Sequence, residues 1–449
     1  MTLKYLRRIS YEIHLWLSIV SGIILFIVCL SGTILTFQDE YRHIAEPAKY
    51  FVKPQAEQNF LSADELIANV ESAKQEQGMK IDFISIPEQA NRTVMMTLVV
   101  PQQPGEQATP SGRGGGRPSG ERPPRPENET AATGQTGNPG SPQARPGGNP
   151  SRNPNRVFVN PYTGEIVGEG ANVADPFIMS MMRLHRFLWL PIEIGRPVVG
   201  IATIIFCVVC LLGLVLWIPR SWRLLKNWRA WRTGLRVRFR NGMFPFIYDL
   251  HKTVGFYILI PSLVLALTGL CWSFAWYRDA ASYLLDDEIF KQRRFQVEKI
   301  EPVEPSGQPF SVDAMIALQN RLTPGPGAMT ITIPQDNETA LVIRKGRTGF
   351  FSLAMPDRTQ WDRYRGTVVP VEHFGKMVEV ERFVDMPLGA QIAASIRGLH
   401  LGDITGMSSK IFFGIVCLFA TSLPVTGVII WIKKLRVKRK KRKAAEPVT

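Results

Sequence analysis

Residues 15–37 read LWLSIVSGIILFIVCLSGTILTF, a stretch without a charged side chain. A helix needs about 20 apolar residues to cross the hydrocarbon core of a bilayer, so this stretch is long enough to span one. It is too long, and too poorly followed by small residues, for a removable signal, and we interpret it as a retained helix. Three further blocks share its character, which predicts four transmembrane helices in all. These blocks are Val198 to Ile218, Phe256 to Trp276 and Ile411 to Ile432.

The basic residues lie at particular ends of these blocks. The net charge is +15, and clusters occur at Lys4 to Arg8, Arg220 to Arg240 and Lys433 to Lys443. Basic residues next to membrane helices favour the cytoplasmic side, so both termini and the middle loop are expected inside. Two long segments, about 39–196 and 278–398, are then outside. Attraction to anionic lipid explains the clusters, and we expect no nucleic-acid binding.

The odd-numbered predicted helices repeat one another. His14 is followed eighteen residues later by Gly32, and His251 is followed eighteen residues later by Gly269. A serine or threonine precedes each glycine, and a phenylalanine follows each glycine five residues later. The identical spacing indicates that the two halves of the chain are copies.

The even-numbered predicted helices show the same relationship. A leucine directly precedes both His185 and His400, and an arginine lies two or three residues before each histidine. A Gly-x-x-x-Trp-Ile motif follows, beginning at Gly213 in the first half and Gly427 in the second. The intervals from histidine to glycine differ by one residue between the halves.

The two outer segments also repeat. Each has a serine-led helical pattern, at Ser62 and Ser311, followed by an Ile-Pro pair that begins at Ile86 and Ile333. A strand and turn containing Tyr-x-Gly close both copies. These patterns predict helix, strand, turn, strand and a closing strand in each copy. Duplication of the membrane and outer parts together is the simplest account.

The first outer copy contains an insertion at 101–156, made mainly of Pro, Gly, Arg, Asn, Gln and Ser. This composition cannot form a core, so the segment is predicted to be a disordered loop between strands. Lengthening a surface loop costs little entropy, which makes such an insertion tolerable.

Four of the six histidines lie at repeat-equivalent positions on the ends of the predicted helices. Membrane level places His14 with His251 near the cytoplasmic face, and His185 with His400 near the outer face. Two neutral imidazoles per site, without a carboxylate or thiolate, suit the axial positions of haem iron. We therefore predict two haem sites, whose iron is held by His14 and His251 at the inner site and by His185 and His400 at the outer site.

Other interpretations of these residues remain open. Each histidine could instead be a polar anchor, and zinc or copper could replace haem. Arg183, Arg186 and Arg397 flank the outer histidines, and they are candidates for contacts with haem propionates or simply mark the membrane boundary. The tryptophans near the helix ends, Trp217 and Trp272 among them, are expected to be mainly interfacial belt residues.

The Leu-His motifs before the second and fourth helices, the Ser/Thr-Gly marks and the Tyr-x-Gly turns resemble the PepSY-associated transmembrane family. The resemblance covers nearly the whole chain. It implies an α-helical membrane bundle of four transmembrane helices, formed by two duplicated hairpins, with α+β PepSY-like extracytoplasmic domains. The outer segments at about 55–170 and 308–370 are similar to the PepSY modules themselves.

The resemblance also implies a function. Family members are similar to iron-regulated inner-membrane proteins that reduce ferric siderophores on the periplasmic side. The expectation is a dihaem oxidoreductase with two haem b groups, located in the bacterial inner membrane with both termini cytoplasmic. It would pass electrons to a ferric siderophore or another ferric chelate and release Fe(II). Since the sequence contains no nicotinamide or flavin fingerprint, a cytoplasmic donor or a quinol would supply the electrons.

The expected domain organisation follows the two hairpins. The first half comprises the N-terminus with the first helix at 1–38, the first periplasmic domain at 39–180, and the outer ligand segment with the second helix at 181–219. A basic cytoplasmic loop at 220–247 joins the halves. The second half comprises the third helix at 248–277, the second periplasmic domain at 278–395, the outer ligand segment with the fourth helix at 396–432, and a basic tail at 433–449.

Two other functions compete with the reductase. One is a non-redox PepSY membrane protein that binds peptides or regulates an envelope protease, with histidines that only anchor helices. The other is a siderophore permease, which is less favoured because four helices with almost no charge at mid-membrane are few for a transporter.

Overall fold

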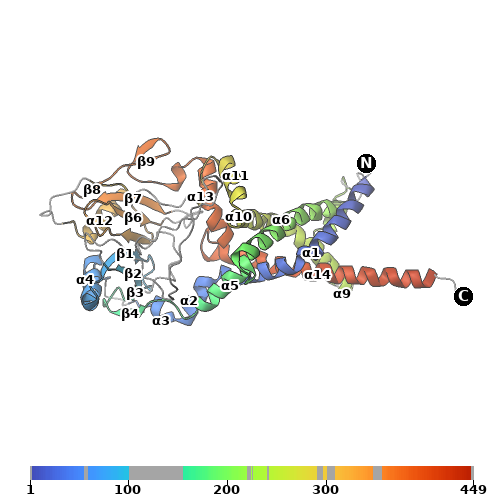
Figure 1. The fold of residues 1–449 in the computed structure, drawn as a ribbon, viewed down its shortest axis with the longest axis horizontal. Helices are drawn as coiled ribbons and strands as arrows, with labels where there is room; N and C mark the ends of the chain where they lie inside the picture. Colours follow the sequence, from blue (N-terminus) through green and yellow to red (C-terminus); the bar gives the residue numbers. More distant parts are fainter. Residues whose placement is uncertain are drawn as a thin grey trace, which may run out of the picture.

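The structure is a computed structural model, and it describes residues 3–54, 59–100, 155–219, 224, 226–239, 242–290, 297–300, 309–346 and 356–445. The molecule is elongated, with long helices at one end and a β-sheet at the other (Figure 1). Both termini lie at the helical end, far from the sheet. The predicted insertion at 101–156 falls outside the described residues, except for its last two positions.

The helical end contains the candidate membrane spans. Within the described residues, three helices are long and apolar enough to cross a membrane, and a bent pair makes a fourth candidate. The long helices are α1 (Leu3–Thr36), α6 (Ile192–Trp217) and α14 (Met407–Ala445). The bent pair is α9 (Met243–Tyr257) and α10 (Leu259–Ser273). The chain is therefore a membrane protein.

The third predicted span, at 248–277, consists of two helices with a bend between them. Its two halves meet at Ile258 with a bend of 61°. Pro261 follows just after the break and has no N–H to donate to the carbonyl of Tyr257, four residues earlier, which weakens the helix at this point. The bend separates α9, which carries His251, from α10, which carries Gly269.

Pairs of glycine and phenylalanine join the two hairpins. At the outer end of α1, the ring of Phe37 packs against Gly414 of α14, where an added Cβ would lie 2.8 Å from the ring. The ring of Phe274, just after α10, packs against Gly200 of α6, where the same distance would be 2.5 Å. Because the two contacts are repeat-equivalent, the hairpins pack with approximate two-fold symmetry.

The outer segments form the pattern that the repeat predicts. In the first copy, α4 (Ala63–Ala73) precedes β1 (Lys80–Ile86), β2 (Val94–Val99), β3 (Arg156–Val159) and β4 (Ile166–Glu169). In the second copy, α12 (Val312–Leu322) precedes β5 (Met329–Thr332), β6 (Leu341–Lys345), β7 (Asp357–Asp362) and β8 (Thr367–Val368).

The two copies share one sheet. Its eight strands have the order β4-β3-β2-β1-β5-β6-β7-β8, so the first strands of the two copies pair antiparallel at the centre. Ile84 of β1 pairs with Ile331 of β5, and both side chains are fully buried. The apolar residues of both copies form one core beneath α4 and α12. The outer copies, described from sequence as two domains, thus form one continuous layer.

Each copy also caps the helix of the other. The Asp64 carboxylate accepts hydrogen bonds from the backbone N–H groups of Val312 and Asp313, at 2.9 and 3.0 Å. The Asp313 carboxylate accepts from the N–H groups of Ala63 and Asp64, at 2.8 and 3.0 Å. Carboxylates at helix N-termini satisfy unpaired N–H groups and favour the helix dipole. The exchange fixes α4 and α12 relative to each other.

We expect Asp313→Ala to destabilise the outer sheet by about 1 kcal/mol at neutral pH, the usual cost of losing an N-terminal cap. Burial alone would raise the pKa of Asp313, but the hydrogen bonds from the N-terminus of α4 outweigh it and hold that pKa below its usual value. A lowered folded-state pKa stabilises the protein above the unfolded value of about 3.9, and this contribution disappears as the pH falls through the folded-state pKa.

Urea unfolding of the full chain in detergent would check this prediction. The difference between wild type and Asp313→Ala should be present at pH 7 and shrink below about pH 4, where the wild-type carboxylate becomes protonated. Asp64→Ala, the repeat-equivalent variant, should also destabilise the outer sheet at pH 7, because it removes the cap of α12. A difference that does not change with pH would contradict the capping account.

Short helices connect the two ends of the molecule. In the first half these are α2 (Gln38–Ala45), α3 (Pro47–Tyr50) and α5 (Asp175–Phe187), and in the second half α11 (Ala275–Leu285) and α13 (Leu388–Leu401). The remaining elements are η1 (Gln75–Gln77), α8 (Trp228–Arg232), η3 (Phe383–Asp385) and a hairpin of β9 (Val371–His373) and β10 (Lys376–Val378). The helices α5 and α13 carry the two outer histidines close to their C-terminal ends.

Candidate functional site

Each of the four repeat-equivalent histidines packs against a glycine of another helix in its own half. His185 of α5 lies over Gly32 of α1, and His400 of α13 lies over Gly269 of α10. An added Cβ would be 3.1 Å from His185 Cε1 at Gly32, and 2.9 Å from His400 Cε1 at Gly269. The outer rings thus occupy space that only glycine leaves free.

The inner histidines use the other pair of repeated glycines. A Cβ added at Gly213 of α6 would lie 3.5 Å from Cε1 of His14, and one added at Gly427 of α14 would lie 3.5 Å from Cε1 of His251. The glycines found from sequence therefore belong to the histidine environments. Gly32 and Gly269, which follow the inner histidines by eighteen residues in the sequence, contact the outer histidines instead.

The outer histidines are held by matching hydrogen bonds. The Nδ1 atom of His185 lies 2.9 Å from the carbonyl oxygen of Val28, and the Nδ1 atom of His400 lies 3.0 Å from that of Leu265. A carbonyl oxygen only accepts, so Nδ1 carries the proton in both rings. Ser31 and Thr268 lie beside these Nδ1 atoms at 3.3 and 3.2 Å.

The inner histidines are held through the same ring atom. His14 Nδ1 lies 3.1 Å from the carbonyl oxygen of Val209. His251 Nδ1 lies 2.8 Å from Oγ1 of Thr426, whose hydroxyl donates to the carbonyl of Ser422 and therefore accepts from the histidine. All four Nε2 atoms are consequently left with a lone pair, the state required of a metal ligand.

The two outer rings face each other at a defined spacing. The ring centres of His185 and His400 are 6.2 Å apart, with an angle of 54° between the ring planes. Two imidazoles that bind one metal ion from opposite sides, through bonds of about 2 Å each, place their ring centres roughly 6 Å apart. Burial lowers the pKa of His185 and lowers that of His400 to about 4, so both rings are neutral at neutral pH.

The two inner histidines are not as close to each other as the two outer ones. His14 of α1 is near enough to His251 of α9 for the charge of one to act on the other. Within the part of the chain that the structure describes, their rings are not in mutual contact. The structure therefore brings the outer pair together at ligand spacing, and the inner pair into the same region of the bundle.

One cationic residue near the outer pair was not recognised from the sequence. Arg196, in the first turn of α6, donates from Nε to the carbonyl of Trp272 at 2.8 Å. Burial and the charge of Arg196 lower the pKa of Arg186, and the charge of Arg186 also acts on His400. Neither arginine forms an ion pair with an acidic group among the described residues. The signal was a lone arginine two residues before the apolar block that begins at Val198.

The other two predicted arginines are less enclosed. Arg183 and Arg397 are both exposed on the surfaces of α5 and α13. The charge of Arg397 acts on Asp403, just after α13. Arg186 is therefore the predicted arginine whose charge acts on His400, and Arg196 lies beside Trp272, a neighbour of the same ring.

Two tryptophans are not simple belt residues. Trp217 is 9% exposed, stacks on Phe256 at 3.8 Å between ring centres, and donates to the carbonyl of Gly234. The Trp272 ring lies 5.0 Å from that of His400. Leu35 holds the position in the first half that matches Trp272, so the surroundings of the outer pair are not fully symmetric.

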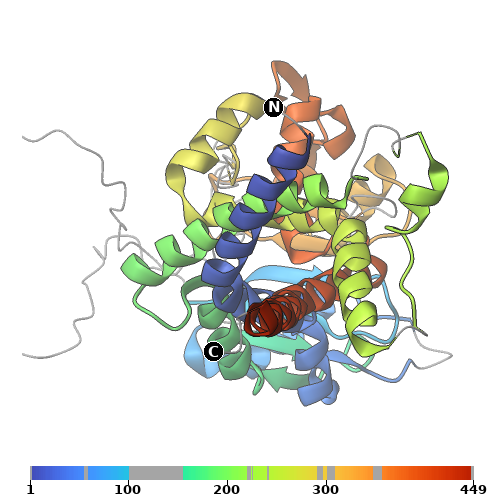
Figure 2. The same cartoon turned by 90° about the vertical axis from the view of Figure 1, so that its right-hand side faces the viewer.

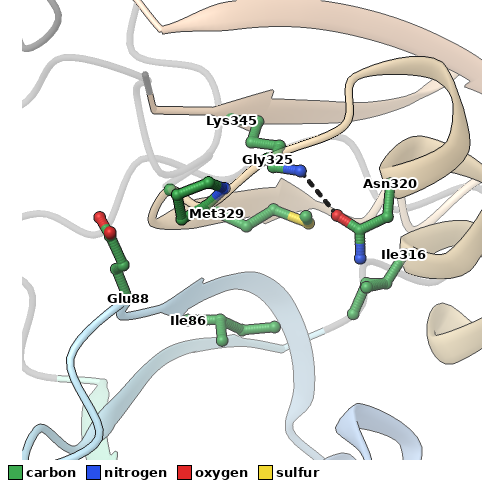
Figure 3. A pocket seen from close by; sticks show the side chains of 9 residues that line it. Ile86, Glu88, Ile316, Asn320, Gly325, Met329 and Lys345 are labelled. Carbon is green, nitrogen blue, oxygen red and sulfur yellow. Dashed lines mark hydrogen bonds between the residues drawn. The ribbon is translucent and has the colours of Figure 1, made fainter. Parts of the chain in front are cut away.

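A separate cavity lies in the outer domain, remote from the four histidines (Figure 1; Figure 3). It measures about 310 Å³ and lies beneath α12, where Ile86, Met329 and Lys345 line it from one row of three adjacent strands. Lys345 donates to Oδ1 of Asn320 and to the carbonyl of Thr323, at the C-terminal end of α12. These bonds give Lys345 a structural role.

The described residues contain no group of three or more His, Cys, Asp or Glu side chains arranged to hold a metal ion. A structural zinc site needs four such ligands, so the histidine pairs are of a different kind. Two imidazoles with free Nε2 atoms fit a planar metal group that brings its own equatorial ligands, and haem is such a group. Arg186 and Arg196 add positive charge near the outer pair, which would suit a group that carries carboxylates.

Comparison with known proteins places the chain in a family. It is 24% identical over 287 residues to an uncharacterised protein of Pseudomonas aeruginosa, PA4219, a match that covers 58% of this chain and 64% of the relative. The chain thus spans somewhat less than two thirds of that relative. The model of the PepSY-associated TM region matches residues 11–434, which include all four histidines. The chain therefore belongs to the family of the PepSY-associated transmembrane region.

Proposed function

We propose that this protein binds two haem b groups and moves electrons across the bacterial inner membrane to a ferric chelate. The observation that supports this best is the shared geometry of the four histidines. Each histidine packs against a glycine at a repeat-equivalent position, and its Nδ1 atom makes a hydrogen bond, which leaves Nε2 free. Oriented ring nitrogens of this kind are typical of metal-ligating histidines.

The residues have distinct roles in this proposal. His185 and His400 hold the outer haem, and His14 and His251 hold the inner one. Carbonyl and hydroxyl acceptors fix each ring and raise the basicity of its Nε2 atom. Bound haem supplies a one-electron couple at each membrane face, whose potential depends on burial and hydrogen bonding.

The proposed substrate is a ferric siderophore or another ferric chelate on the outer side. One electron converts its Fe(III) to Fe(II), which hard oxygen chelators bind far less tightly, so the metal is released. The electron is replaced through the inner site by a cytoplasmic donor or a quinol. Both termini are proposed to be cytoplasmic, because the basic clusters flank the same ends of the helices.

Vesicles with a trapped reductant would test this function. The chain is loaded with haem and reconstituted, a ferric hydroxamate is added outside, and external Fe(II) is followed with an impermeant ferrous-specific dye. Fe(II) should form outside at a rate that depends on the protein. Colourless preparations made with ample haem supply would favour a non-redox PepSY membrane protein instead.

We expect the double substitution of Arg186→Gln and Arg196→Gln to weaken retention of the outer haem without abolishing it. Hydrogen bonds to charged groups contribute about 1.5–3 kcal/mol, so loss of the two cations should raise haem dissociation more than tenfold. Transfer of haem to an apoprotein acceptor would measure the rate. The control is Arg183→Gln, which removes an exposed arginine from the same helix. Equal rates in both variants would argue against the assignment.

A further inference from the structure

The helix α11 (Ala275–Leu285) leaves the membrane helices abruptly. Only Phe274 separates it from α10, and that residue has an extended backbone, with φ −130° and ψ 127°. α11 then lies beside α13 where the helices meet the outer domain (Figure 1). Viewed along the long axis, the yellow helix is at the periphery of the molecule (Figure 2). α11 therefore begins at the level where the bundle ends.

One face of α11 is apolar and uncovered. Trp276, Tyr283 and Leu284 are 61%, 91% and 83% exposed. At 3.6 residues per turn these residues share a face with Ala280, which is also exposed. The adjoining face is already used, since Tyr277, Ala281 and Leu285 pack into a cluster with α13.

The matching element in the first half has a different surface. There α2 follows Phe37 as α11 follows Phe274, but its sequence is QDEYRHIA. Its Asp39 pairs with Arg42 and Lys410, and its Glu40 pairs with Lys410. The helix after the first span thus carries ion pairs in the first half, whereas the matching helix in the second half has an exposed apolar face. The repeat alone does not account for the exposed face of α11.

The apolar face continues onto the start of α13. Leu388 and Ile392, four residues apart on that helix, are 72% and 43% exposed. Gly389 lies directly against the backbone carbonyl of Leu285, where a Cβ could not be accommodated. The two helices are therefore in direct backbone contact at this point.

We propose that this face of α11 and α13 lies in the outer leaflet, at the boundary between lipid headgroups and acyl chains. The face is continuous with the membrane span α10, and it combines a tryptophan, a tyrosine and aliphatic side chains. Tryptophan and tyrosine favour the interface, and helices with one apolar face lie in its plane. Both the position of this face and its residue types therefore favour lipid as its partner.

The contact links lipid to the outer histidine pair. α13 carries His400 as its penultimate residue, and α11 packs against α13 through the shared cluster. Lipid bound to this face therefore fixes the depth of His400 relative to the membrane. This inference does not depend on haem.

Cysteine labelling in lipid nanodiscs would test the proposal. Tyr283→Cys and Leu284→Cys are compared with Glu288→Cys, an exposed position just past the same helix. All are made in a background where the five native cysteines, which are buried or half-buried, are replaced by alanine. A polarity-sensitive fluorophore reports the surroundings, and an impermeant thiol reagent reports access from water.

The proposal predicts blue-shifted emission and at least several-fold slower labelling at positions 283 and 284 than at 288. Discs that carry a single copy of the chain must give the same result. Water-like emission and fast labelling at all three positions would overturn the proposal. Protection that disappears in single-copy discs would also overturn it, since a second copy would then be the occupant.

Discussion

His400→Ala is expected to lower the haem content from two groups to one per chain and to abolish reduction of an external ferric chelate. The substitution removes one of the two Nε2 ligands at the outer site. A single imidazole cannot hold the iron from both sides, and the remaining ring of His185 faces the space where the partner ring stood. The expected loss of reduction is complete, because the proposed function makes the outer site the last step before the substrate.

The inner site provides a contrast to this variant. His14→Ala or His251→Ala should remove the inner haem and leave the outer haem reducible by an external chemical reductant. His373→Ala is the control, since His373 lies in the outer domain beside Glu381 and has no repeat partner. Absorption spectra of each purified variant measure the content. A His400→Ala protein that still holds two haems would show that the ligands are wrongly assigned.

Gly269→Leu should abolish the outer haem almost as completely as His400→Ala, although it alters no ligand. A Cβ at this position already lies 2.9 Å from Cε1 of His400, and the branched side chain would push the ring out of line. Overpacking of this kind costs about 1–3 kcal/mol, and here the strain falls on the ligand itself. The inner haem should remain, because Gly427 and His251 are unchanged.

Gly255→Leu is a matched control for this prediction. It lies in the same bent span, but its added Cβ would be 3.9 Å from the nearest atoms, those of Leu423. We expect this variant to keep both haems. Spectra and haem content of the two variants in parallel decide the matter. Equal retention of the outer haem in both would mean that close packing on glycine does not position His400.

The duplication made much of this molecule predictable. Equal spacing of His14 to Gly32 and of His251 to Gly269 showed that helices and histidines repeat. Hydropathy located the apolar blocks, and the serine-led segments gave the helices and strands of the outer copies. All of these are local signals of periodicity and composition, which a sequence displays directly.

The contacts between the copies could not be predicted. β1 pairs with β5, and α4 and α12 are joined by two carboxylates, Asp64 and Asp313, that reach across about 250 positions of the chain. The partners of the glycines were also hidden, because Gly32 shares a helix with His14 but contacts His185. Spacing along one helix gives positions on that helix, whereas contacts depend on how helices are arranged in space.

Two residues at the outer site show the limits of composition. Arg196 was counted with the outer segment at 39–196, just before the apolar block at Val198, although the helix of the span begins earlier and includes it. Trp272 was grouped with belt aromatics, although its ring lies against His400. A tryptophan at a helix end can be either a belt residue or a neighbour of the histidine, and only the position of α13 shows that Trp272 is the second.

The pyridine haemochrome assay on the wild-type chain, purified from cells supplied with haem precursor, tests the central claim most directly. Four histidines with free Nε2 atoms in two pairs predict two haem b groups for each polypeptide, with the sharp reduced α-band of six-coordinate iron. A colourless protein, or one that binds a single haem under saturating supply, would contradict the account.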